Sequence, residues 1–323
     1  MSASDGSNFS RRSLIKSGVL ATVGATVGFA VTRSALAAAA DKALPLITKT
    51  VPSTKEKLPV IGVGTNNFGV SAPDELAARR EVLAKLPELG GAIVDTAQAY
   101  GTSEAVIGEA VAAIGNRSKL FIATKTPLGG DVSNAKNTLE KSFAALRTDK
   151  IDLLQIHNVH GIDELLPLYK DYKKAGRVRY IGITTSQDSQ YPQLVEAMKK
   201  YDFDFVQVDY SMQDRSAEKE VFPIAQSKGM GVLVNMPLGG RRGNNLMTQV
   251  AGKELPKWAA DIDVTSWAQF FLKYDISHPV VTAAIPGTTK LSHLEDNQKA
   301  GRGRLPDAAT RKKMEEFWAG IAT

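Results

Sequence analysis

The chain has 323 residues, no cysteine and a formal net charge of +6 at pH 7. Without cysteine, disulfides, thiol nucleophiles and cysteine metal sites are excluded. The four histidines, at positions 157, 160, 278 and 293, lack zinc-site spacing, so no metal site is expected. The first 37 residues carry four basic side chains and one acidic one, which leaves +3 on the remainder. That charge is too small to predict a nucleic-acid partner.

The first 37 residues have the pattern of an export signal. Arg11 and Arg12 form a basic start, residues 17–31 are mildly apolar, and Ala35-Leu36-Ala37 has the A-x-A form of a cleavage site. This order is typical of a twin-arginine signal peptide, and the apolar stretch is too short to span a bilayer. We expect recognition by the twin-arginine export machinery, cleavage after about Ala37, and a periplasmic mature chain without a stable membrane span. Retention of the signal as an anchor stays open.

The rest of the chain is predicted to be one α/β domain. Residues 38–56 are interpreted as a polar linker and residues 57–323 as the folded domain. Apolar, partly β-branched runs predict buried strands with helices between them. Strands are expected near residues 58–64, 92–97, 120–125, 152–157, 179–184, 204–210, 230–236 and 281–286. Eight such units are the count of a (β/α)8 TIM barrel, in which the active site lies at the carboxyl ends of the strands.

Reactive side chains stand at the ends of three successive predicted strands. One strand ends in Asp95, and Tyr100 follows on a turn where Gly101 permits a sharp change of direction. The next two strands end in Lys125 and His157. Neighbouring strands lie roughly 4.8 Å apart, and side chains alternate along each of them. The four side chains are therefore expected to meet at one end of the sheet.

The short sequence motifs around these residues resemble those of the aldo-keto reductase superfamily. They are Asp95-Thr96-Ala97 with Tyr100-Gly101 and Ser103-Glu104, then Ala123-Thr124-Lys125, then residues 151–158, and the likeness runs from about Lys57 to Asn297. The resemblance implies an NADP(H)-dependent oxidoreductase that reduces an aldehyde or ketone to an alcohol, or catalyses the reverse. Its substrate would be a small carbonyl compound or alcohol.

The resemblance also implies a role for each of the four residues. A phenol with a pKa of about 10 is a poor proton donor near neutrality, and an adjacent ammonium favours the phenolate. Tyr100 is therefore interpreted as the general acid/base, Lys125 as the group that tunes it, and Asp95 as the anchor of Lys125. His157 is expected to orient and polarise the carbonyl oxygen. The alternative interpretation is that Asp95 and Lys125 form only a structural ion pair in the core.

Cofactor contacts follow from the same resemblance. Gly64 and Thr65 are expected near the nicotinamide, and Thr184, Thr185 and Gln207 near its carboxamide. The positions implied for the rest of the dinucleotide are Pro237 and Leu238 after the seventh strand, Thr288, Thr289, Lys290 and His293 at the 2′-phosphate, and Asp296 and Asn297 at the adenine. NADP is preferred to NAD.

Parts of the sequence resemble two other classes of protein. Asn235 stands where many relatives carry an aromatic residue, and two threonines replace the usual Ser-Asn pair, which favours a non-catalytic nucleotide-binding or regulatory barrel subunit. The complete set of four reactive residues argues against that alternative. A dinucleotide-binding Rossmann fold is disfavoured, because Asn67 occupies the third glycine position after Gly62 and Gly64.

Overall fold

The computed structural model describes residues 44–125, 132–240 and 245–321. The predicted signal peptide and the first residues of the predicted linker lie outside the described residues. In the described part, eight parallel strands form one sheet in which each strand pairs with the next along the chain. Their bounds are β3 (Val63–Gly64), β4 (Ile93–Asp95), β5 (Phe121–Lys125), β6 (Ile151–Ile156), β7 (Val178–Thr184), β8 (Phe205–Asp209), β9 (Gly231–Asn235) and β10 (Ala283–Ala284). The predicted (β/α)8 fold is confirmed.

The sheet closes on itself where its first and last strands meet. The backbone N–H of Gly64 donates to the carbonyl of Pro286 over 3.1 Å. The approach is too close for side chains. A Cβ at Gly64 would lie 3.0 Å from the Ile285 carbonyl oxygen, and one at Gly62 would lie 3.0 Å from Cγ2 of Ile285. Glycine at these two positions therefore permits the closure.

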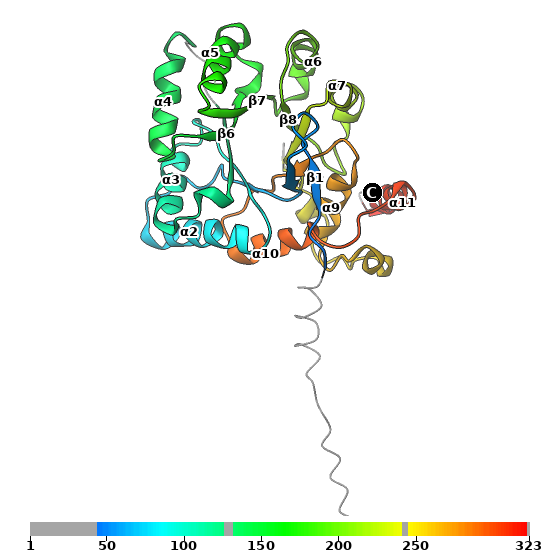
Figure 1. Ribbon diagram of the computed structural model, residues 1–323. Helices are drawn as coiled ribbons and strands as arrows, with labels where there is room; N and C mark the ends of the chain where they lie inside the picture. The colour runs from blue at the N-terminus through cyan, green and yellow to red at the C-terminus, as the bar shows by residue number, and fades with distance from the viewer. Residues whose placement is uncertain (1–43, 126–131, 241–244, 322–323) are drawn as a thin grey trace, which may run out of the picture. The chain divides into compact units, whose positions relative to one another are not determined.

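Helices cover the outside of the strands, as Figure 1 shows. They are α2 (Pro73–Glu88), α3 (Ser103–Ile114), α4 (Ala135–Ala145), α5 (Ile162–Lys174), α6 (Tyr191–Lys200), α7 (Val221–Ser227), α8 (Leu246–Gln249), α9 (Trp267–Ser277), α10 (Leu291–Ala300) and α11 (Ala308–Ile321). The larger hydrophobic core lies between them and the outer faces of the strands. Most of the apolar area that stabilises the fold is therefore buried outside the barrel.

A second, smaller core fills the inside of the barrel. Its members point inward from successive strands and are Ile93, Phe121, Ala123, Leu153, Tyr180, Phe205, Leu233, Ala283 and Ile285, joined by Val51 and Leu58. The rings of Tyr180 and Phe205 are 5.3 Å apart between centroids. The interior is thus a packed core, as is usual for this architecture, and the polar residues lie above it at the carboxyl ends of the strands.

A hairpin closes the amino end of the barrel. It pairs β1 (Thr48–Thr50) with β2 (Lys57–Pro59) in antiparallel register. The sequence predicted a polar linker through residue 56 and one strand over 58–64, whereas the structure has the hairpin and then β3. The reason is tertiary: Val51 and Leu58 of the hairpin complete the apolar interior, and neither has that partner in the local sequence.

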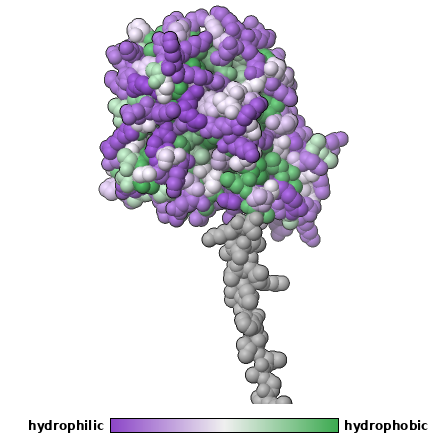
Figure 2. Space-filling view, in the orientation of Figure 1, coloured by the Kyte–Doolittle hydropathy of each residue, from purple (hydrophilic) through white to green (hydrophobic). Residues whose placement is uncertain are grey.

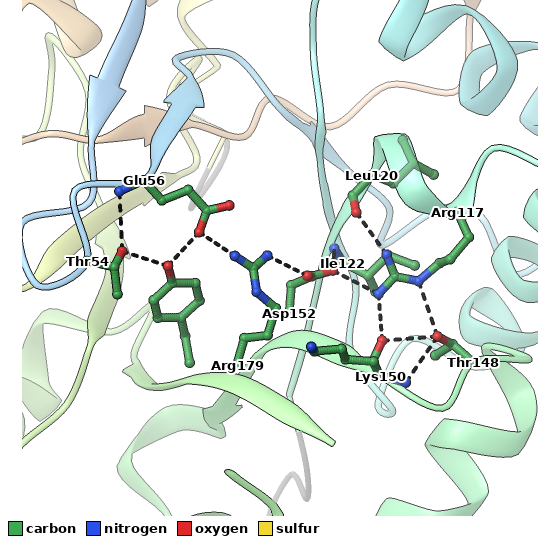
Figure 3. A network of polar contacts seen from close by, with 10 residues as sticks. Thr54, Glu56, Arg117, Leu120, Ile122, Thr148, Lys150, Asp152 and Arg179 are labelled. Atoms are coloured by element: carbon green, nitrogen blue, oxygen red, sulfur yellow. Dashed lines mark hydrogen bonds and ion pairs between the residues drawn. The ribbon is translucent and has the colours of Figure 1, made fainter. Parts of the chain in front are cut away.

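Ion pairs hold the hairpin to the barrel (Figure 3). Glu56 lies 2.5 Å from Arg179, which lies 2.8 Å from Asp152. Asp152 also accepts from Arg117 over 2.8 Å and from the backbone N–H of Ile122 over 2.8 Å. The network joins the turn of the hairpin to the amino ends of β5, β6 and β7.

The surface of the domain is largely polar. The face in Figure 2 is mainly hydrophilic, with apolar residues in separate patches. Among the described residues, the exposed large hydrophobic side chains are Leu46 and Met247. No helix in the described ranges is both long and apolar enough to span a bilayer.

Candidate active site

Asp95 and Lys125 form a buried ion pair at the carboxyl end of the barrel. Asp95 ends β4 and Lys125 ends β5, and both side chains point inward, 3% and 2% exposed. Lys125 Nζ lies 2.6 Å from Oδ2 of Asp95 and donates to the backbone carbonyl of Thr96 over 2.8 Å. The pairing satisfies two charges that would each be costly to bury alone.

Each charge opposes the effect of burial on the pKa of its partner. Burial raises the pKa of the Asp95 carboxyl, and the Lys125 ammonium opposes that shift. Burial works to lower the pKa of Lys125, but Asp95 and Tyr100 outweigh it and hold that pKa above its ordinary value. Lys125 is therefore a cation throughout the physiological range, and it is shielded from water.

Tyr100 lies between this cation and the cleft. Gly101 takes a left-handed conformation, with φ of +61°, and lets the chain turn from β4 into α3. The Lys125 ammonium lies 5.3 Å from the centre of the Tyr100 ring. The rings of Tyr100 and His157 meet edge to face with their centroids 6.3 Å apart. The four residues that the sequence singled out are thus brought together.

His157 follows β6 directly and is held as a neutral imidazole. Burial, and secondarily the Lys125 charge, lower its pKa to about 3. Its Nδ1 is buried without a hydrogen-bond partner among the described residues. Val159, two residues later, has φ of +53°, a strained conformation for a β-branched residue. The sharp turn after β6 places His157 at the carboxyl end of the barrel, and the chain then continues into α5.

A cleft of about 670 Å³ opens above these residues. Most of the predicted cofactor positions line it: Gly64, Thr65, Gln207, Pro237, Leu238, Thr288, Thr289, Lys290 and His293, together with Asp95 and Tyr100. The loop that begins α10 is ordered locally, since the backbone N–H of Lys290 donates to the Thr288 hydroxyl over 3.2 Å. The cleft therefore joins the reactive residues to the start of α10.

Four predicted cofactor residues do not line the cleft. The Thr185 hydroxyl donates to Gln190 over 2.5 Å, and Thr184 is buried beside Gln207. On α10, the Asp296 carboxylate accepts from Ser266 over 2.7 Å and from Gln269 over 2.6 Å. Asn297, the next residue, is 4% exposed. Their cofactor roles stay predictions.

Several lining residues were not among the predicted site residues. They are Asn66, Asn67, Ser186, Asn235, Met236, Gly239, Gly240, Asn245, Met247, Ile285, Pro286 and Gly287. Each lies at or beyond the carboxyl end of a strand, which is the signal that could have identified them. Asn235 donates to Asp209 over 2.7 Å, so the position where the family resemblance led us to expect an aromatic ring holds a polar pair.

The fold and these residues define a (β/α)8 barrel with a polar site at the carboxyl ends of its strands. The sequence model of the aldo/keto reductase family matches residues 60–316. The chain belongs to that family.

Two bacterial relatives agree with this assignment. Methylglyoxal reductase YeaE of Escherichia coli is 30% identical over 250 residues, which cover 74% of this chain and 84% of that protein. The uncharacterized oxidoreductase YrpG of Bacillus subtilis is 29% identical over 281 residues, covering 74% and 86% of the two chains.

Two solved structures share the fold. The holo form of aldo-keto reductase AKR11C1 from Bacillus halodurans is 22% identical with a TM-score of 0.69, covering 84% of this chain and 96% of that one. An aldo-keto reductase from Klebsiella pneumoniae in complex with NADPH is 21% identical with a TM-score of 0.70, covering 85% and 96%. At these identities the likeness establishes the architecture alone.

Proposed function

We propose that the protein is an NADP(H)-dependent reductase that converts a small aldehyde or ketone to an alcohol, or catalyses the reverse. The observation that carries the proposal is the convergence of Asp95, Tyr100, Lys125 and His157 beside the cleft. Bound NADPH would supply the hydride. The protein's own part is then to bind the carbonyl compound, exclude water and deliver a proton to the developing alkoxide.

Tyr100 is the residue that moves the proton. It lines the cleft, and the buried Lys125 ammonium lies close behind its ring. A fixed cation in a water-poor site stabilises a phenolate far more than it would in water. Asp95 holds that cation in place and offsets the cost of burying it. The phenol can therefore give up its proton to the alkoxide and recover it afterwards.

His157 is proposed to orient the carbonyl group. With a pKa of about 3, its imidazole is neutral and offers one ring N–H at physiological pH. A neutral donor polarises the carbonyl oxygen without competing with Tyr100 for the role of acid. The edge-to-face contact with the Tyr100 ring fixes the two donors relative to each other.

The cleft fits a dinucleotide phosphate. At its start, Gly64 lines the cleft and has no side chain to occupy it. At its far end, Thr288, Lys290 and His293 combine hydroxyl, ammonium and imidazole groups near the first turn of α10. We propose that these three hold the 2′-phosphate, that Thr184 and Gln207 face the carboxamide, and that NADP is preferred to NAD. Asp296 and Asn297 remain proposed adenine contacts.

Parallel fluorescence titrations of residues 38–323 with NADPH and NADH test this proposal. We expect NADPH to bind at least tenfold more tightly than NADH, followed by turnover of a carbonyl panel that includes methylglyoxal. Equal binding of the two would overturn the phosphate site and leave the chemistry standing. Binding of neither, with no turnover, would favour a non-catalytic barrel.

We further propose that the mature chain acts in the periplasm with its cofactor already bound. The arginine pair, the apolar stretch and the A-x-A motif of residues 1–37 support export. Cell fractionation and amino-terminal sequencing of the full-length product test this. A periplasmic protein that starts near residue 38 and releases nucleotide on denaturation is the expected result. A full-length cytoplasmic chain contradicts export, and a nucleotide-free periplasmic chain contradicts cofactor retention.

A further inference from the structure

Two glutamines continue the hydrogen-bond chain of the site into the barrel. Gln155 on β6 donates from Nε2 to Oε1 of Gln207 on β8 over 2.6 Å. Gln207 Nε2 lies 3.3 Å from Oδ2 of Asp95, the same oxygen that accepts from Lys125. Gln155 and Gln207 are 0% and 1% exposed, so water does not compete for these bonds. The chain therefore runs from Gln155 through Gln207 to the buried carboxylate.

The chemistry of the groups sets the direction of this chain. An ionised carboxylate only accepts hydrogen bonds, so the NH2 end of Gln207 must face Asp95. The Gln207 oxygen then faces Gln155, which must turn its own NH2 toward it. Without a donor at position 155, the Gln207 amide could rotate by half a turn and present its oxygen to the carboxylate. Gln155 thus decides which end of Gln207 meets Asp95.

The barrel is shaped to admit the Gln155 side chain. Gly182 on β7 lies against it, and a Cβ at that position would be 2.9 Å from Cγ of Gln155 and 3.2 Å from its Oε1. Oε1 of Gln155 is buried without a hydrogen-bond partner in the described part of the chain. A buried amide with an unpartnered oxygen stabilises a core less than an apolar side chain of similar shape. Packing alone therefore does not account for glutamine here.

We propose that Gln155 is a positioning residue of the active site. It orients the Gln207 amide so that a donor faces Asp95, and the stabilised carboxylate holds the Lys125 ammonium beside Tyr100. The kinetic part of this inference rests on the proposed reductase function. The hydrogen-bond part concerns the cofactor-free protein and stands by itself.

The variant Gln155→Met tests the inference, because methionine is unbranched like glutamine and has no donor. Gln226→Met, at an exposed position on α7 outside the barrel interior, is the matched control. Two measurements are made on each protein. One is the pH profile of kcat for NADPH-dependent reduction of methylglyoxal and 4-nitrobenzaldehyde, with the Kd for NADPH. The other is the Tm of the cofactor-free protein at pH 5 and pH 8.

In Gln155→Met, the loss of the hydrogen-bond donor affects stability and turnover only when Asp95 is ionised. We therefore expect the acidic limb of the kcat profile to move up by about 0.5 pH unit or more in Gln155→Met, with Kd for NADPH within about threefold of wild type. The loss of Tm relative to wild type should be larger at pH 8 than at pH 5 by about 2 °C or more. The control should show neither change.

If the acidic limb of the kcat profile does not move and the loss of Tm is equal at pH 5 and pH 8, Gln155 only fills space. That result would overturn the inference. A wild-type protein that neither binds NADPH nor reduces a carbonyl would overturn the proposed function instead, and the Tm comparison would still decide the hydrogen-bond part. If Gln155→Met does not fold, Gly182→Ala replaces it. That variant keeps the amide but crowds it, and the same two shifts are expected.

Discussion

At the level of single residues, the site is built around two charges that are costly to bury. Lys125 and Asp95 are nearly inaccessible and lie 2.6 Å apart, so neither can lose its partner without leaving an uncompensated ion in the interior. The Tyr100 ring closes the cleft side of the pair, and the imidazole of His157 borders that ring. A cation that solvent does not screen therefore lies against the Tyr100 ring.

The first prediction concerns the hydroxyl of Tyr100. In Tyr100→Phe we expect kcat to fall by about 10²–10⁴-fold, the usual contribution of a positioned acid/base. The phenyl ring keeps the shape of the cleft wall, so the Kd for NADPH should stay within a few-fold. Steady-state kinetics with fluorescence titration measures both, and turnover at the wild-type rate would refute the assigned role.

The second prediction concerns the stability of the fold in acid. The folded pKa of His157 is about 3, whereas an unfolded histidine has its ordinary value of 6.5. Between those two values the unfolded chain binds a proton that the folded chain does not. The free energy of unfolding therefore falls as the pH is lowered from 6.5 toward 3.

His157→Gln should remove part of that slope, which Tm measured from pH 7 to pH 4 will reveal. The half-buried His278, whose pKa is lowered to about 4 by desolvation and by Arg311 and Lys49, should retain the rest. His293→Gln, an exposed residue on α10, serves as the control. An unchanged slope in His157→Gln would show that His157 is not buried as a neutral group.

At the scale of elements, short turns place the reactive side chains and close helix contacts hold the strands. Gly101 turns the chain from β4 into α3, and α3 then packs tightly against the end of α4. Ser103 begins α3, and its hydroxyl donates to the Thr65 carbonyl over 2.7 Å. The helix start is thereby joined to the loop that follows β3.

The third prediction tests the contact between α3 and α4. A Cβ at Gly108 would lie 2.1 Å from the backbone oxygen of Ala145, so Gly108→Ala must displace one helix. We expect a loss of about 1–3 kcal/mol in the free energy of unfolding, despite the better helix propensity of alanine. Urea unfolding measures it, with the exposed Ala113→Ser on the same helix as the control. A stabilised variant would contradict the close approach.

At the scale of the whole barrel, the two ends have different tasks. The carboxyl end carries the cleft and the reactive residues, and the amino end is closed by the β1–β2 hairpin and its ion pairs. Asp152 is central to that closure, because two arginines and one backbone N–H converge on it while its side chain is 7% exposed. Stability and chemistry are therefore separable by mutation.

The fourth prediction uses this separation. Asp152→Asn leaves Arg117 and Arg179 without their shared carboxylate, and we expect a loss of about 2–4 kcal/mol in the free energy of unfolding. Limited proteolysis should cut more readily near residues 52–56, while kcat stays unchanged. Asp202→Asn, whose side chain is 99% exposed, should have no measurable effect. A loss of kcat without a loss of stability would contradict the assignment of stability to the amino end and of chemistry to the carboxyl end.

The strand pattern and the family resemblance together predicted the barrel and placed the four candidate catalytic residues at one end of it. Apolar runs that end in Asp95, Lys125 and His157 carry local information, because strand period and strand ends are properties of short segments. These assignments required no knowledge of distant contacts beyond the parallel order of the strands.

Only the tertiary structure decided what depends on partners far along the chain. The hairpin of residues 48–59 exists because Val51 and Leu58 complete a core built from other strands. Asp296 is bonded to Ser266 and Gln269 rather than turned to the cleft, since α9 packs against α10. The orientation of Gln207 depends on Gln155, 52 residues away. Such contacts join residues that no local pattern relates, because closing a barrel brings together side chains from separate strands.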